Sequence, residues 1–314
     1  MDSRTWTAYN AAQSEEKTRF AALLSDLCRT IQPPEQSMGR PRLPLSDMVF
    51  AAAFKVYVGF SSRRFTCDLR EAYADGHIDS TPHFNSVSRY LANPALTEIL
   101  KELIALSSLP LKAVETDFAV DASGFSTSRF VRWYDKKYGQ EKHKREWFKA
   151  HLICGVQTKI VTGVDISDWT VYDGYFFAPL VRQTAANFSI SEVSADKAYL
   201  SHQNVELVDG LGGTPFIPFK SRNIARIEDS MWTKMYHYFM FNREEFLMHY
   251  HKRSNIESVF SMVKGKFGDS VRSKSDVGQV NEVLCKLLCH NICVLVRAMH
   301  DLGIEPAFTN SGRG

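Results

Sequence analysis

The chain of 314 residues has few of the features that mark a membrane or secreted protein. No apolar run stands out as long enough to span a bilayer, and the polar N-terminus of mixed charge does not resemble a secretory signal. Six cysteines are too few, in a chain of this length, to indicate a secreted disulfide framework. A glycine-rich phosphate loop and a dinucleotide fingerprint are also missing. We therefore predict a cytoplasmic protein that uses no nucleotide cofactor.

The net charge is only +3, but positively charged residues are concentrated in two segments. Residues 129–149 contain eight Lys or Arg and three acids, and residues 252–274 contain six Lys or Arg and two acids. Two separate positive segments favour a polyanionic partner over a small neutral substrate. A solvated loop explains the first segment equally well. If nucleic acid is the partner, that segment would contact it through Lys142, Lys144 and Arg145.

Residues 1–110 are predicted to form a helical N-terminal domain. The clearest helix begins with Ser46 as its N-cap and ends at Gly59. Glycine and proline residues interrupt the pattern that follows, which predicts three shorter helices. They are expected around residues 63–75, 83–92 and 95–107.

One of these helices, in the segment HFNSVSRYL, fits the second helix of a helix-turn-helix. Ser86, Ser88 and Arg89 would then face DNA. Arg63 and Arg64 would contact the DNA backbone. Small helical bundles without any DNA-binding role share this pattern, so a purely structural helix is the alternative.

Strand-like segments begin near residue 112, with VETDFAVDAS. The segments WFKAHLICGVQ and KIVTGVDIS come next, and a short turn at Thr158–Lys159 predicts that they form an antiparallel hairpin. A helix over residues 173–187 and a strand ending at Asp196 follow. A helix capped by Ser201 then leads to a strand in TPFIPFK.

Two further helices complete the order β-β-β-α-β-α-β-α, which is that of an RNase H-like fold. We therefore predict an α/β domain at residues 111–305, with a mixed five-stranded sheet flanked by helices. Its last element is an apolar helix in DVGQVNEVLCKLLCHNICVLVRAMHDLG. Residues 306–314 are expected to be a flexible tail.

The helix before that last one contains the most informative segment, YHKRSNIESVFSMVKGKFG. Tyr250, Arg253, Glu257 and Lys264 recur at helical spacings, which predicts that they share one stripe of a single helix. The apolar residues form a neighbouring stripe that is expected to be buried. A carboxylate flanked by cations can hold a metal ion while the cations bind phosphate. Taken alone, however, such a stripe is more commonly a solvated surface with an Arg–Glu pair.

Carboxylates predicted at two strand ends favour a metal-binding role for this stripe over a solvated surface. Asp121 ends the first strand and Asp196 ends the fourth, and the predicted fold places these strands side by side. Glu257 would arrive beside them from the later helix. Each Asp alone is best explained by turn or capping roles, and Asp117 competes with Asp121 for the first position. The other acids of the region are expected at a hairpin end and a helix start, namely Asp165 and Asp173.

With these residues, the chain resembles the DDE transposases of bacterial and archaeal insertion sequences, in the group marked by a YREK signature. The resemblance covers about residues 112–300. It rests on Asp121 in VDASGFS, Asp196 in ADKAY and the complete Tyr-x2-Arg-x3-Glu-x6-Lys pattern. Ala198 departs from the Gly of many relatives, and the short segment between Asp196 and Glu257 leaves little room for the large β-strand insertion of some others.

The resemblance implies an enzyme that binds transposon inverted-repeat ends, cleaves phosphodiester bonds and transfers the 3′ ends into target DNA. Asp121, Asp196 and Glu257 would hold two Mg²⁺ ions, with Mn²⁺ as a substitute. A homodimer on DNA, in the cytoplasm and nucleoid of a bacterium or archaeon, is the expected assembly. The expected phosphate contacts come from Tyr250, Arg253 and Lys264, with Lys197 adding positive potential.

Two other functions fit the same residues. One is a transposase-derived DNA-binding protein that has lost cleavage, and the other is an RNase H-like nuclease without strand transfer. Aromatic residues in or beside the first basic segment would stack on unpaired bases in any of these proteins, although core packing explains them equally well. They are Trp133, Tyr134 and Trp147.

Overall fold

A computed structural model describes residues 3–33, 42–127, 147–221, 223–224 and 230–309. Contacts within the chain divide it into two compact units. The sheet unit consists of Leu111–Phe125 and Trp147–Met262. The helical unit consists of Met1–Pro110, a segment from Ser126 and the chain from Val263 onward.

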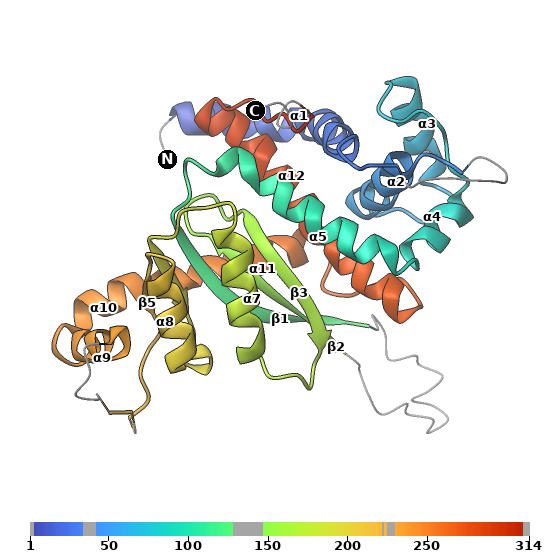
Figure 1. The fold of residues 1–314 in the computed structure, drawn as a ribbon. Coiled ribbons are helices and arrows are strands. Elements are labelled where there is room, and N and C mark those ends of the chain that lie inside the picture. The colour runs from blue at the N-terminus through green and yellow to red at the C-terminus, as the bar shows by residue number, and fades with distance from the viewer. Residues whose placement is uncertain (1–2, 34–41, 128–146, 222, 225–229, 310–314) are drawn as a thin grey trace, which may run out of the picture. The chain divides into compact units, whose positions relative to one another are not determined.

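The sheet unit contains a five-stranded sheet in the order β3-β2-β1-β4-β5 (Figure 1). Strands β2 and β3 are antiparallel, whereas β4 is parallel to both β1 and β5. The predicted mixed five-stranded sheet is therefore confirmed, including the hairpin, whose turn has Lys159 at a φ of 67°. The strands are β1 (Asp117–Ser126), β2 (Trp147–Gly155), β3 (Val161–Asp168), β4 (Glu192–Ala195) and β5 (Thr214–Phe216).

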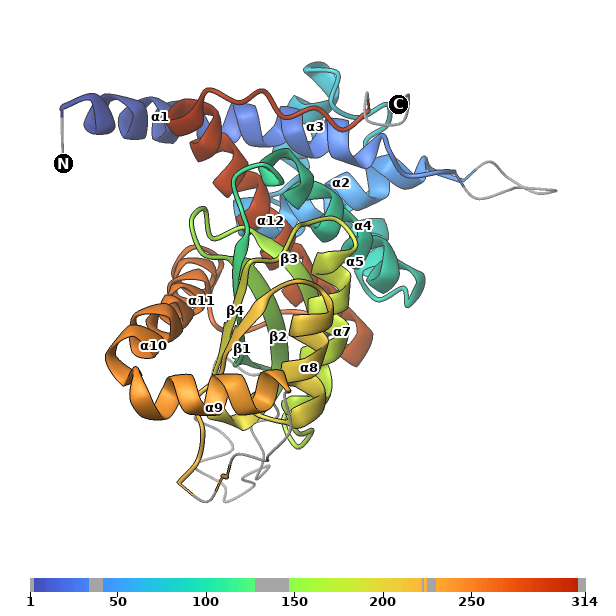
Figure 2. The ribbon, with the colours of Figure 1, turned by 60° about the vertical axis from the view of Figure 1, so that its left-hand side comes forward.

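Helices cover both faces of this sheet (Figure 2). Helix α7 (Gly174–Ala185) packs on β2 and β3, and α8 (His202–Gly210) lies on the same side. Helix α8 begins where predicted, because Ser201 Oγ accepts a hydrogen bond of 3.1 Å from the Asn204 N–H. The α10 and α11 segments lie on the opposite face.

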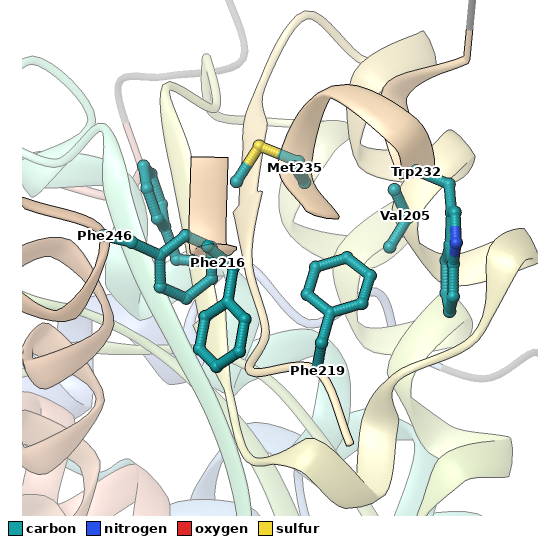
Figure 3. Close-up of a cluster of buried hydrophobic side chains, with 7 residues drawn as sticks. Val205, Phe216, Phe219, Trp232, Met235 and Phe246 are labelled. Carbon is teal, nitrogen blue, oxygen red and sulfur yellow. The ribbon is translucent and has the colours of Figure 1, made fainter. Parts of the chain in front are cut away.

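The chain after β5 differs from the prediction of one helix. It forms α9 (Met231–Phe241), α10 (Arg243–Tyr250), a 3₁₀ turn η3 (His251–Arg253) and α11 (Ser254–Phe267). The physical reason is an aromatic cluster in which side chains of α9 and α10 pack on α8 and β5 (Figure 3). We call it the aromatic cluster; its members are Val205, Phe216, Phe219, Trp232, Met235, Phe239 and Phe246.

The helical unit contains the helices expected before the sheet. Helix α2 ends as predicted at Gly59, whose φ is 72°, but it begins at Leu45, so Ser46 is not its N-cap. Its first-turn Asp47 instead accepts hydrogen bonds from the N–H and hydroxyl of Ser80. The helices are α1 (Ser3–Cys28), α2 (Leu45–Val58), α3 (Thr66–Ala74), α4 (Phe84–Leu91) and α5 (Ala95–Ser108).

The last helix, α12 (Asp276–Leu302), packs among α1, α2 and α5 rather than in the sheet unit to which we had assigned it. Asn291 Nδ2 donates to Ile104 O at 3.2 Å and to Ser107 Oγ at 2.9 Å. Contrary to our expectation, this helix is long and apolar enough to cross a membrane. However, 78% of its most apolar stretch of 18 residues is buried inside the protein. Its apolar surface therefore forms the core of the helical unit.

Candidate active site

The register of the parallel pair β1–β4 brings two predicted acids to the same level. Val120 pairs with Ala195, so the next residues along both strands are Asp121 and Asp196. Asp196 directly follows the last residue of β4, as predicted. Asp121 does not end its strand as we expected, because the backbone stays extended through Ser126 and Phe125 is buried again. Buried residues precede both acids, namely Phe118 to Val120 and Val193 to Ala195. Asp196 Oδ1 accepts a 2.6 Å hydrogen bond from the Lys197 N–H, which starts a 3₁₀ turn and ends the strand.

Glu257 joins these acids from α11. Ile256 and Val259 are fully buried, which leaves Glu257 on the open side of the helix with 58% of its side chain exposed. The pKa of Asp121 is raised, chiefly by burial. The Ala122 N–H and the Arg253 guanidinium oppose this shift, and the negative charges of Asp196 and Glu257 add to it. Asp121 therefore lies close enough to Asp196 and to Glu257 for both charges to act on it.

Arg253 lies between two of the three acids. Its Nη1 donates to Asp121 Oδ2 at 2.6 Å, and its Nη2 donates to Glu257 Oε1 at 2.5 Å. The sequence predicted a phosphate contact for this guanidinium, whereas the structure shows it neutralising the acids. In this arrangement, the described part of the chain has no group of three His, Cys, Asp or Glu side chains placed to hold a metal ion.

The other residues of the stripe are distributed differently from the prediction. Tyr250 is the last residue of α10, so the 3₁₀ turn η3 separates it from the helix that carries Glu257. Its ring packs on the aromatic cluster. Burial lowers the pKa of Arg253, but Asp121 and Glu257 raise it overall, and Tyr250 lies close enough to add to this rise. Lys264 lies about two turns beyond Glu257 on α11, and partial burial lowers its pKa. Lys197 is exposed beside Asp196.

Asp117, the alternative first-strand acid, has a different environment. Its Oδ2 accepts a 2.7 Å hydrogen bond from Lys252 Nζ at the beginning of β1, four residues before Asp121. Asp165 lies within β3, paired with His151, and not at a hairpin end as expected. Asp173 occupies the N-cap position of α7, as predicted.

Tyr199 is a neighbour of the site that the sequence did not reveal. Its hydroxyl is buried without a hydrogen-bond partner among the described residues. Burial raises its pKa strongly, and Asp121, Asp173 and Asp196 raise it further. A single tyrosine in an Asp-Lys-Ala-Tyr turn belongs to no periodic sequence pattern. Only the acidic side chains around it in the structure indicate that it is a neighbour of the site.

We expect Tyr199→Phe to raise the free energy of unfolding of the metal-free protein by about 1 kcal/mol, because an unsatisfied buried hydroxyl is removed. Urea unfolding of the variant and the unmodified protein measures this difference. A clear loss of stability would show that the hydroxyl has a partner in solution.

The basic residues predicted to contact DNA fall into two groups. Arg63, Arg64 and Arg89 are exposed on the helical unit, and the Arg63 guanidinium lies 5.8 Å from the centre of the Phe84 ring. Residues 75–83 connect α3 to α4, a longer connection than the turn of roughly three or four residues in a helix-turn-helix. The basic residues Lys142, Lys144 and Arg145 lie outside the described residues. So do Trp133 and Tyr134, which were predicted to stack on bases.

The family model for the transposase DDE domain matches residues 112–292, which is more than half of the chain. The chain belongs to the DDE transposase domain family. The DDE domain thus contains all five strands, the three acids and most of α12. The chain is also similar to the probable transposase for insertion sequence element ISA1214 of Archaeoglobus fulgidus, with 25% identity over 209 residues. That match covers 67% of this chain and 62% of the relative.

Proposed function

We propose that this chain is a DNA transposase that binds the inverted-repeat ends of an insertion sequence, cleaves phosphodiester bonds there and transfers the 3′ ends into target DNA. The observation that carries the proposal is the convergence of Asp121, Asp196 and Glu257 on one site within a DDE transposase domain. The YREK subgroup is part of this proposal, because all four of its residues are present at the required spacing.

Carboxylate oxygens are the ligands that Mg²⁺ and Mn²⁺ prefer. Burial is the main cause of the raised pKa of Asp121, and the nearby charges of Asp196 and Glu257 add to it against Arg253. A partly buried carboxylate with two acidic neighbours supports a proposal of divalent-cation binding. Asp121, Asp196 and Glu257 would hold two such ions. When bound, the ions would activate the attacking oxygen and stabilise the leaving oxygen of the phosphodiester.

The cations around the acids would hold the DNA. Arg253 has a planar guanidinium suited to phosphate, and it would exchange its carboxylate partners for a phosphate when cations occupy the acids. Tyr250 and Lys264 would contact neighbouring phosphates, and Lys197 would add positive potential. The inverted repeats would be recognised by the helical unit through Arg63, Arg64 and Arg89, with Lys142, Lys144 and Arg145 adding contacts.

This exchange predicts opposite effects of Arg253→Gln on two ligands. Without DNA, we expect the affinity for Mn²⁺ to rise about three- to tenfold, because a competing positive charge is removed from the acids. The affinity for transposon-end DNA should fall. Calorimetric titration with Mn²⁺ and a DNA-binding assay measure the two effects, with Arg243→Gln as the matched control. Weaker Mn²⁺ binding by the Arg253 variant would show that the guanidinium organises the site instead.

Cleavage of DNA that carries the element's own inverted repeats tests the function. With Mg²⁺ or Mn²⁺, the protein should cut at the repeat end and join the freed 3′ end to a second duplex, and a chelator should stop both steps. Equal cutting of scrambled DNA without joining would identify a nuclease without strand transfer. Specific binding to the ends without cutting, by folded protein, would identify a silent DNA-binding derivative. Crosslinking on paired ends tests the proposed homodimer.

A further inference from the structure

Lys252 connects the turn before α11 to two strands of the sheet. Its Nζ donates to Asp117 Oδ2 at 2.7 Å and to Glu192 Oε2 at 2.7 Å. Asp117 and Glu192 are partners in the β1–β4 register, so one ammonium bridges two neighbouring strands. Partial burial lowers the pKa of Lys252, but the hydrogen bonds to both acids outweigh this effect and the net pKa is raised.

Lys252 and Arg253 bind acids at two successive levels of the strands. The pair Asp117 and Glu192 lies four residues before the pair Asp121 and Asp196. Alternation along a strand places residues i and i+4 on the same face, about 13 Å apart. Lys252 binds the first pair, while Arg253 binds Asp121 of the second. Two consecutive residues of η3 therefore attach the turn to the sheet at both levels.

His249 strengthens the attachment at the first level. Its Nδ1 lies 2.8 Å from Glu192 Oε1, and its ring stacks on Phe216 with centres 4.4 Å apart. Glu192 therefore holds both the end of α10 and the 3₁₀ turn. The side chains of Lys252, Asp117 and Glu192 are only 18–31% exposed, so their geometry is restricted by packing.

We propose that Lys252 is a positioning residue for the acid site, which sets the start of α11 on β1 and β4 so that Arg253 and Glu257 reach Asp121. The inference rests on the proposed function, since it concerns the same site. Lys252 itself is directed to Asp117 and Glu192, which lie at the start of β1 and β4, four residues before Asp121 and Asp196. Without its bridge, the turn loses its direct link to Asp117 and Glu192. The ion pairs of Arg253 with Asp121 and Glu257 cannot replace that link, because they must open when phosphate binds.

The test compares Lys252→Met, Lys252→Arg and the neutral triple variant Asp117→Asn/Glu192→Gln/Lys252→Met, with exposed Lys220→Met as the control. The triple variant controls for misfolding of Lys252→Met, because it removes the charges of both acids together with that of the lysine and so leaves no unpaired charge. We expect Lys252→Met and the triple variant to lower the rate of Mn²⁺-dependent cleavage about 10- to 100-fold. Their affinity for end DNA should change less than about twofold, since no phosphate contact is lost. Lys252→Arg should recover most of the rate, and Lys220→Met should match the unmodified protein.

Amide hydrogen exchange tests the positioning without any cleavage assay. In DNA-free protein, the amides of residues 253–258 should exchange faster in Lys252→Met than in the unmodified protein, with the core of α12 unchanged. Unchanged exchange in this segment would overturn the proposal. So would a loss of DNA affinity with a smaller salt dependence, which would identify Lys252 as a phosphate contact. Failure of the unmodified protein to cleave would count against the proposed function, while the exchange result would still decide the role of Lys252.

Discussion

Glu257→Gln is expected to abolish Mg²⁺-dependent cleavage of transposon-end DNA, with a loss on the order of 10³-fold or more. The substitution keeps the shape of the side chain but removes a negative charge that acts on Asp121 and that the proposed cations would need. Because 58% of the Glu257 side chain is exposed, the fold should tolerate the change. The substitution weakens the pairing of this side chain with Arg253, and that arginine retains Asp121.

The measurement is the single-turnover rate of cleavage at saturating protein, together with the affinity for the same DNA. Binding should be largely preserved, since Glu257 is a carboxylate and repels phosphate. Glu244→Gln, at an exposed acid in the first turn of α10, is the matched control and should cleave at the normal rate. Full activity of Glu257→Gln would remove Glu257 from the proposed machinery.

His151 is expected to cause the largest effect of pH on stability. It lies in β2 with a fully buried side chain, stacks on Phe176 of α7 with ring centres 3.8 Å apart, and has Nε2 2.8 Å from Ser167 Oγ. Burial lowers its pKa from 6.5 to about 4, opposed by the nearby Asp173 and Asp165 and assisted by Lys149. The folded state therefore prefers the neutral imidazole.

The sign of the effect follows from this lowered pKa. Above pH 6.5 the imidazole is neutral in both states and costs nothing, whereas between pH 6.5 and 4 the unfolded state gains the proton first. At roughly 1.4 kcal/mol for each pKa unit, the free energy of unfolding should fall by about 3 kcal/mol over this range because of His151.

His151→Gln removes the titrating group and keeps a polar side chain for Ser167. We expect its free energy of unfolding to fall by about 3 kcal/mol less than that of the unmodified protein between pH 6.5 and 4. Urea unfolding at a series of pH values measures the difference, with His251→Gln at an exposed position as the control. Parallel pH profiles for the variant and the unmodified protein would contradict the buried neutral state.

The order of strands and helices in the DDE domain could be predicted because each element has a strong local pattern. The apolar strand in VETDFAVDAS, the hairpin turn at Thr158–Lys159 and the cap at Ser201 all depend on nearby residues. The positions of Asp121 and Asp196 followed from these elements, since each comes directly after three buried residues of its strand, although β1 continues past Asp121 to Ser126. The helices whose number or packing differs from the prediction depend on contacts with residues far away in the chain. Helices α9 and α10 pack on the aromatic cluster, and α12 packs between N-terminal helices.

The sequence by itself determined the residue types of the site, the spacing from Tyr250 to Lys264 and the strands that bring Asp121 and Asp196 to the site, because local propensity and periodicity act over a few residues. Only the tertiary structure decided how the charges pair. It placed Arg253 on Asp121 and Glu257, Lys252 on Asp117 and Glu192, and a 3₁₀ turn within the expected helix. Ion pairs between a turn and two parallel strands depend on register and helix placement, which residues far apart in the chain set together.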